Sequence, residues 1–425
     1  MKKLSQSNAI LLIICLMYLI LYVDRVNIAT VAPLVKADLA LSNTEIGLAL
    51  SAFAYPYAAF QLVGGYLGDK FGARLTLTIS VLIVCAATAS TAFVGGLTSL
   101  FMARITLGIG EGATLPTATR AMALWIPENR WGFAQGITHT FARIGNALTP
   151  PLIVFLLEVM SWRESFLAVA VLSFIWVIIW VWYLRYVPKD KPRPKTQTAE
   201  ESHLNKRGAS EPVPWLRLLH RMLPVTAVDF CYGWTLWLFL SWVPSFFYQN
   251  YHQDLKQSAL FSTGVFLAGV IGDTLGGIVS DQILKRTGNR TAARRNVIVV
   301  GMLGGLTFLM PVMFVDDVTI AAISLAAAFF FVELVVAPLW VVPMDIAPQF
   351  ACSASGMMNF GFGLAGIISP LVFGYLIDQT GSWTLPFTGS AVLLLVGAGL
   401  AFYVNPSRPF ESTDAPMLVT QKNPH

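Results

Sequence analysis

Four charged residues interrupt apolar stretches of the chain, where charge is rare. Asp24 and Arg25 stand in the first of these stretches, and Arg104 and Glu111 stand in the fourth. Arg104 and Glu111 are seven residues apart, so on a helix they share one face at a separation of about 10 Å along the axis. A carboxylate near an arginine ionises readily, whereas a carboxylate in apolar surroundings keeps its proton. The four residues could therefore exchange protons and bind an anion.

These charges would be costly inside a membrane, so their default interpretation is functional. On that interpretation Asp24 and Glu111 take up protons from outside, and a freed arginine, Arg25 or Arg104, binds an anion. Charge-neutral loading would then allow the protein to change conformation. A structural alternative stays open, in which Asp24 pairs with Arg104, or Arg25 with Glu111, only to hold helices together.

Arg143 adds another charge, about ten residues into the fifth apolar stretch. His139 lies one helical turn before it on the same face. A second cation in this place would suit a substrate that is a dianion, or an acid of a different shape. The alternative is that Arg143 pairs with an acid such as Glu333. For His139 itself, a core histidine with its hydrogen bonds satisfied is the favoured interpretation.

Three further acids, Asp229, Asp273 and Glu333, fall in predicted spans. Asp229 and Asp273 could line a cavity or cap a bend made by nearby glycines. Glu333 is followed by Pro338 and Trp340, and broken membrane helices often line a binding site. Glu333 is therefore a candidate for substrate binding.

The elements that must position these residues are membrane helices. Of the 425 residues, 56% are hydrophobic and only 12% are charged, whereas soluble domains carry about 25% charged residues. A bilayer core requires about 20 apolar residues per helix. Twelve spans are predicted: 9–32, 43–66, 75–96, 98–120, 132–157, 163–187, 221–248, 256–280, 295–314, 317–343, 350–377 and 383–404.

The positions of basic residues set the predicted orientation. With both termini in the cytoplasm, only Lys36, Arg163 and Lys256 of the 28 lysines and arginines fall in outer loops, as the positive-inside rule requires. The net charge of +5 therefore indicates no nucleic-acid partner. The predicted parts are a six-helix bundle (1–187), a polar cytoplasmic linker (188–214), a second six-helix bundle (215–405) and a disordered cytoplasmic tail (406–425).

Several function classes lack support in the sequence. The four cysteines stand alone in apolar stretches, so neither a metal site nor a disulfide is expected. No phosphate-binding loop or nucleophile–base pattern occurs. An enzyme is therefore not expected, and transport would draw on a proton gradient with no cofactor. A membrane receptor is also disfavoured, because the linker and tail are too short for a signalling domain.

The two halves of the chain carry related loop motifs. The segment 64–74 follows the second predicted span and contains Gly65, Asp69 and Arg74; Asp281 stands in a shorter copy, 212 residues after Asp69. Repeats at half the chain length are typical of transporters. The first copy resembles the loop signature of the major facilitator superfamily. The resemblance implies an all-α polytopic membrane protein with twelve transmembrane helices in two bundles. The glycines would let the second and eleventh helices touch, and these four residues would stabilise one gating state.

Other motifs resemble the anion:cation symporter family, which includes bacterial sugar-acid permeases. The segments that carry the resemblance are 22–27, 51–57, 104–120 and 240–244, together with Asn359. In that family the acids matching Asp24 and Glu111 couple protons, and the arginine matching Arg25 binds the substrate carboxylate. The family positions that contact or approach substrate match Tyr22, Tyr57, Asn359 and Trp340. The family implies a monomer in the bacterial inner membrane, and Arg143 departs from its neutral polar pattern.

The resulting expectation is a proton-coupled importer of an organic anion such as a sugar acid. The main alternative is a proton-coupled efflux antiporter. The glycine–proline pattern of the fifth helix in such antiporters is absent; the sequence there is 143–151, Arg-Ile-Gly-Asn-Ala-Leu-Thr-Pro-Pro. Uptake of a siderophore, a metal chelate or an aromatic acid also remains open.

Overall fold

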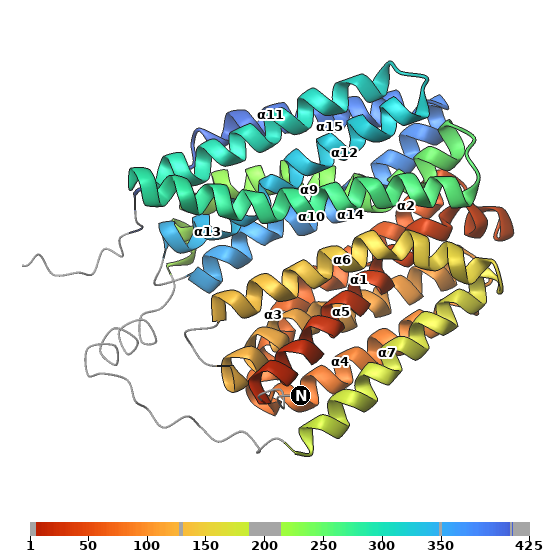
Figure 1. The fold of residues 1–425 in the computed structure, drawn as a ribbon, viewed down its shortest axis with the longest axis horizontal. Coiled ribbons are helices and arrows are strands. Elements are labelled where there is room, and N and C mark those ends of the chain that lie inside the picture. The colour runs from red at the N-terminus through yellow and green to blue at the C-terminus, as the bar shows by residue number, and fades with distance from the viewer. Residues whose placement is uncertain (1–5, 127–130, 187–213, 348–350, 409, 411–425) are drawn as a thin grey trace, which may run out of the picture.

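The structure is a computed structural model in which the described residues form helices and turns and no strand. It describes residues 6–126, 131–186, 214–347, 351–408 and 410. Nearly all of the predicted linker, and the part of the predicted tail from residue 411, lie outside this range. Figure 1 shows two groups of helices, α1 to α7 in red to yellow and α9 to α15 in green to blue. We refer to them as the N bundle and the C bundle.

The N bundle contains the helices that carry the first group of charges. They are α1 (Gln6–Asp38), α2 (Asn43–Ala52), α3 (Ala54–Phe71), α4 (Ala73–Thr91), α5 (Leu97–Trp125), α6 (Trp131–Leu157) and α7 (Trp162–Leu184).

The C bundle repeats this plan with shorter helical pieces at two places. Its elements are α9 (Trp215–Asn250), α10 (Leu255–Thr287), η2 (Ala292–Asn296), α11 (Val297–Leu309), η3 (Met310–Met313), α12 (Val318–Leu334), α13 (Val336–Ile346), α14 (Ala351–Thr380) and α15 (Thr384–Ala401).

All twelve predicted spans are helical, which confirms the predicted fold class. Ten of the described helical segments are long and apolar enough to cross a membrane. The two predicted spans outside this set are the second, which is divided into α2 and α3, and the fourth, which is α5. Helix α5 carries Arg104, Glu111 and Arg120, so its low hydropathy comes from the charged residues that make it a candidate for the site.

Short polar motifs start several helices at the predicted outer side. Ser42 and Glu45 cap α2 reciprocally, and Ser161 and Glu164 cap α7 in the same way. Asp254 caps α10. A capping side chain satisfies one of the backbone N–H groups that have no partner in the first turn of a helix. The loops between helices are therefore short and well defined at this side.

Several helices extend beyond their predicted spans, among them α1, α9 and α10. Helix α1 ends at Asp38 against a predicted 32, α9 begins at Trp215 against 221, and α10 ends at Thr287 against 280. The prediction stops where the apolar run stops. Charged residues can continue a helix into water. Lys285 and Arg286 lie in the last turn of α10, where their positive charge is stabilised by the negative end of the helix dipole.

The second and tenth predicted spans are each broken in two. Helix α2 ends at Ala52 and α12 ends at Leu334. In both cases a proline stands four residues further along, at Pro56 and Pro338. A proline ring clashes with the carbonyl group four residues before it, so each break falls where the sequence places that clash. The sequence interpretation anticipates the break beside Glu333 but not the break in the second span.

Close contact between the bundles occurs where α2 meets α14. A Cβ atom added to Gly47 would lie 2.4 Å from the carbonyl oxygen of Pro370, and one added to Gly374 would lie 2.1 Å from that of Asn43. Both distances are shorter than non-bonded atoms allow, so these two glycines permit the approach. The second and eleventh helices therefore touch, as expected.

Two glycines that stand beside the signature positions in the segment 64–74 face α5. A Cβ atom on Gly64 would lie 2.3 Å from the Cα of Ala113, and one on Gly68 would lie 3.2 Å from the hydroxyl of Thr117. Both partners belong to α5. Gly64 and Gly68 therefore open into the N bundle. The surroundings of Gly65, the first glycine of the signature, lie outside the described part of the structure, so its role in bringing the second and eleventh helices together stays a prediction.

One carboxylate links the two bundles by hydrogen bonds at the N-terminus of α2. Asp378 at the end of α14 accepts hydrogen bonds from the backbone N–H and side-chain amide of Asn43, at 3.1 and 2.8 Å, and from the backbone N–H and hydroxyl of Thr44, both at 2.6 Å. The N-terminus of a helix favours negative charge. Asp378 therefore stabilises the arrangement in which α2 and α14 are in contact.

Replacement of Asp378 by alanine should let the predicted outer ends of the bundles move apart. Charged hydrogen bonds contribute about 1.5–3 kcal/mol each, and the loss of one of them would raise the separated population at least about tenfold. The test is a distance measurement between spin labels on F93C and F314C, two exposed positions on the outer loops, in a background without native cysteines.

The matched control is Asp316→Ala, an acid on the outer loop that precedes α12. D316A should leave the distance distribution unchanged, whereas D378A should add a longer component. An identical distribution for D378A and the parent would show that Asp378 contributes nothing to this contact.

Candidate functional site

The strongest charge contact in the N bundle joins Arg25 on α1 to Glu111 on α5. Two guanidinium nitrogens of Arg25 donate to Glu111 Oε2, Nη2 at 2.6 Å and Nε at 3.1 Å. The two residues are 7% and 1% exposed. Of the two ion pairs considered from the sequence, this is the one that forms. The other carboxylate oxygen of Glu111 accepts no hydrogen bond from a described residue.

Aromatic rings surround the guanidinium of Arg25. Its Cζ lies 4.6 Å from the ring centroid of Tyr22, 4.9 Å from that of Phe53 and 4.8 Å from that of Tyr57. A cation over an aromatic face gains about 0.5–2 kcal/mol. Trp237 of the C bundle lies 6.1 Å from Phe53, centroid to centroid. The rings therefore hold Arg25 at the side of the N bundle that meets α9.

Asp24 points to a different part of the N bundle. Its Oδ1 accepts a hydrogen bond from Thr88 on α4 at 2.8 Å, and its Oδ2 accepts one from Ser173 on α7 at 2.9 Å. Successive residues of a helix point about 100° apart, so Asp24 and Arg25 face different neighbours. Thr88 and Ser173 were not predicted, because a hydroxyl in an apolar span carries no distinguishing sequence signal.

Arg104 is a buried cation that forms no ion pair with any described residue. Its Cζ lies 5.2 Å from the Phe53 ring centroid, and its Nε has no hydrogen-bond acceptor among the described residues. The pairing with Asp24 that the sequence left open is not formed. Arg104 therefore supplies positive charge beside the Arg25–Glu111 pair without a carboxylate of its own.

A second charge cluster crosses from one bundle to the other. Arg143 on α6 lies 3.0 Å from Glu333 at the end of α12 and 3.4 Å from Asp273 on α10. The pairing of Arg143 with Glu333, considered from the sequence, is therefore present, and Asp273 joins it. His139 is exposed and packs edge-on against Tyr18 at 5.9 Å, so it is not a buried core histidine.

The remaining predicted residues lie in the C bundle. Asn359 donates a hydrogen bond to Gln61 of α3 at 3.1 Å and so links the bundles. Asp229 is buried, and its Oδ2 has no hydrogen-bond donor among the described residues. Trp340 lies on α13, beyond the break, with 40% of its surface exposed. The structure thus brings Arg25, Tyr22 and Tyr57 together and places Trp340 on a separate short helix.

A model of one protein family matches residues 14–366, and its description is Major Facilitator Superfamily. The chain belongs to this superfamily. It is therefore a multi-pass membrane transporter and not an enzyme, and the organisation of its helices is the major facilitator fold.

Curated relatives of this facilitator are named as transporters of organic acids. The "Probable sulfoacetate transporter SauU" of Cupriavidus necator is 46% identical over 417 residues, which cover 97% of each chain. The "Hexuronate transporter" of Bacillus subtilis is 29% identical and covers 93% of this chain and 92% of its own. The "D-galactonate transporter" of Escherichia coli is also 29% identical, over 87% and 89%.

Solved structures show the same fold at low identity. A D-xylose-proton symporter superposes with a TM-score of 0.77 at 15% identity, over 95% of this chain and 99% of the other. A bacterial homologue of the human lysosomal transporter Spinster superposes with a TM-score of 0.75 at 17% identity, over 94% and 97%.

The loop motifs of this facilitator lie at the ends of the bundles opposite the α2–α14 contact. Asp281 contacts Arg294 at 3.3 Å, and Arg294 also donates to Asp345 on α13 at 3.2 Å. In the N bundle, the guanidinium of Arg74 lies 5.8 Å from a ring of Trp125. The motif in the C bundle therefore ties α10, η2 and α13 together. For two predicted gating residues on α3, the surroundings of Gly65 and the side chain of Asp69 lie outside the described part of the structure.

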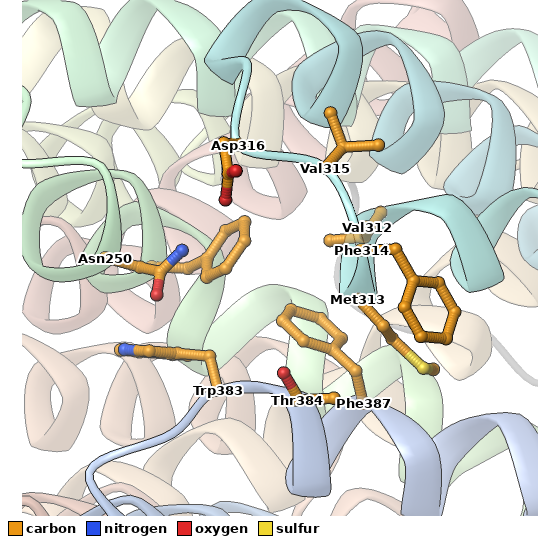
Figure 2. A pocket seen from close by; sticks show the side chains of 10 residues that line it. Asn250, Val312, Met313, Phe314, Val315, Asp316, Trp383, Thr384 and Phe387 are labelled. Atoms are coloured by element: carbon orange, nitrogen blue, oxygen red, sulfur yellow. The ribbon is translucent and has the colours of Figure 1, made fainter.

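A separate pocket of about 190 Å³ opens at the outer ends of the C bundle. Figure 2 shows Asn250, Asp316, Trp383 and Phe387 around it, from the end of α9, the loop before α12 and the start of α15. None of its lining residues is basic, so it offers no counter-charge to an anion. The described residues also contain no group of three or more His, Cys, Asp or Glu that could hold a metal.

Proposed function

We propose that this facilitator takes up a small organic anion together with protons across the bacterial inner membrane. Both termini would lie in the cytoplasm, the acting unit would be a monomer, and the proton gradient would supply the energy without a cofactor. The observation that carries the proposal is the buried contact of 2.6 Å between Arg25 and Glu111, with the unpaired Arg104 beside it.

Protonation of Glu111 is the step that would prepare the anion site. While Glu111 is charged, it neutralises Arg25, and an incoming anion would meet a carboxylate in the same place. A proton on Glu111 removes that charge, and the guanidinium of Arg25 can then form paired hydrogen bonds with a carboxylate or sulfonate. Arg104 adds a second positive charge, and Asp24 is the candidate for a further proton.

The aromatic rings limit the size of the anion and orient it. Tyr22 and Tyr57 each present a phenol group beside Arg25, and a phenol can donate to or accept from a substrate hydroxyl. The names of the relatives indicate small acids, with or without hydroxyl groups. We therefore place the substrate among short carboxylates, sulfonates and sugar acids.

Alternating access would follow from movement of one bundle against the other around this site. The contacts between α2 and α14 would hold the outer side closed, and their release would open it. Charged residues moving through the hydrocarbon region are costly, so movement is favoured when the acids carry protons and the arginine carries its anion.

The experiment is uptake into proteoliposomes with an acidic outside and a neutral inside. Labelled sulfoacetate, hexuronate and galactonate are the anion probes, and a lipophilic cation is the contrasting probe. We expect uptake of at least one anion, driven by the pH gradient and abolished when a protonophore collapses it. Accumulation of the lipophilic cation, or anion uptake that ignores the gradient, would contradict the proposal.

A further inference from the structure

Arg143 contacts two carboxylates of the opposite bundle from within a predicted span. Its partners, Asp273 and Glu333, both belong to the C bundle, whereas Arg143 belongs to α6 of the N bundle. Side-chain exposures are 12% for Arg143, 18% for Asp273 and 0% for Glu333. The contact therefore exists only while these faces of the bundles are together.

The geometry of this contact is weaker than that of the Arg25 pair. Neither carboxylate oxygen of Glu333 accepts a hydrogen bond from a described residue, although Oε2 lies 3.0 Å from Arg143. The hydrogen bond from Arg143 Nε to Asp273 is long, at 3.4 Å. A guanidinium has five N–H donors in a fork that fits one carboxylate or sulfonate in a paired arrangement. Asp273 and Glu333 thus supply charge but leave much of this capacity unused.

Tyr22 connects Arg143 to the site around Arg25. Helices α1 and α6 pack together, and Tyr18 contacts His139 at 5.9 Å. Tyr22 and Arg143 each lie four residues further along, and both helices run in the same predicted direction, so these two residues stand at one level. The Tyr22 ring also lies 4.6 Å from the guanidinium of Arg25. Arg25 and Arg143 therefore both lie close to one tyrosine.

We propose that Arg143 is a second anion subsite, which binds the second acid group of a substrate that carries two. The inference rests on the proposed function, because Arg25 would bind the first group. When the bundles move apart, Arg143 leaves Asp273 and Glu333 on the other bundle, and the second acid group replaces them as its counter-charge. The substrate class is thus a short dianion, such as a sulfocarboxylate or a dicarboxylate.

The test compares acids that differ only in the number of acid groups. Sulfoacetate and malonate carry two, and methanesulfonate and acetate carry one. Binding to the purified full-length protein is measured by calorimetry for the parent, for Arg143→Gln, and for Arg163→Gln as the matched control. Arg163 pairs with Asp38 at 2.7 Å at the outer surface.

We expect R143Q to weaken binding of the two-acid probes about 10- to 100-fold, the range that hydrogen bonds to charged groups give. One-acid probes should change by less than about threefold, which is under 1 kcal/mol.

Glu333→Gln is the second variant, and it leaves Arg143 in place. It removes one competing carboxylate, so affinity for the two-acid probes should rise relative to the parent. The subsite is overturned if R143Q weakens one-acid and two-acid probes equally, or weakens neither. It is also overturned if E333Q leaves two-acid affinity unchanged. In those cases binding of any acid by the parent still supports the proposed function, whereas a parent that binds none of the four acids contradicts both.

Discussion

Glu111→Gln is expected to abolish proton-driven uptake of the anion while exchange of anion for anion continues. The amide of glutamine resembles a protonated carboxyl group in size but carries no removable proton. Arg25 loses its fixed counter-charge and stays available to the substrate, so the variant should bind anion at any pH. Without release of a proton inside, the gradient cannot drive net transport. We expect net uptake to fall at least about 100-fold, as when an interaction of about 3 kcal/mol is lost.

The measurement uses two assays on the same proteoliposomes, uptake driven by an imposed pH gradient and counterflow against internal unlabelled anion. The matched control is Glu158→Gln, an exposed acid that pairs with Lys256 at 3.2 Å; exposed pairs contribute little. Both activities should survive in E158Q. Uptake by E111Q that still rises with external acid would remove Glu111 from the coupling. The same result in Asp24→Asn would leave neither acid with that role.

The sequence identified the charged residues and the helices that carry them, because both follow from one physical constraint. A charge in hydrocarbon is costly, so Asp24, Arg25 and Glu111 stand out against apolar neighbours. The same contrast defines the twelve spans, and the family resemblance supplied the fold that joins them. These inferences depend on composition along the chain and need no knowledge of side-chain directions.

Which charges meet could not be derived from the sequence. Asp24 and Arg25 are adjacent, yet one faces Thr88 and the other faces Glu111. That choice depends on how four helices are rotated and packed against one another. Predicted span boundaries, which are set only to within a few residues, do not determine that rotation. The sequence suggested the pairing of Arg143 with Glu333 but not the contact of Arg143 with Asp273, because Asp273 comes from another helix. Asp378 was missed altogether, since an acid at the end of a predicted span is common.

The breaks in the second and tenth spans follow a local effect that the sequence shows only in part. Pro56 and Pro338 each stand four residues after the end of a helical piece, and the clash of a proline with the preceding turn is a local effect. The rule alone does not single out these two sites, because Pro116 and Pro244 stand inside α5 and α9, which continue without a break. The break in the second span brings Phe53 to the start of α3, where its ring lies beside Arg25 and Arg104.

Arg25→Ala is expected to eliminate binding of the anion. Arg25 forms the buried contact with Glu111 and lies within 5 Å of three aromatic rings, so it is the cation that the proposed function places against the acid group of the substrate. Loss of one partner of a buried charge pair costs about 2–5 kcal/mol in binding. We expect affinity to fall at least about 30-fold, measured by calorimetry with the acids that the parent binds. Arg163→Ala, at the outer surface, should bind normally.

The single variant leaves Glu111 buried without its partner, and such a change destabilises a protein by about 3–5 kcal/mol. A loss of binding could then reflect unfolding, so the decisive protein is the double variant Arg25→Ala with Glu111→Gln. It carries no uncompensated charge at this pair and should melt at a temperature closer to that of the parent. If Arg25 contacts the substrate, the double variant is folded and still does not bind. If Arg25 serves only to neutralise Glu111, the double variant binds with the affinity of the parent, and the cation for the substrate must be sought at Arg104.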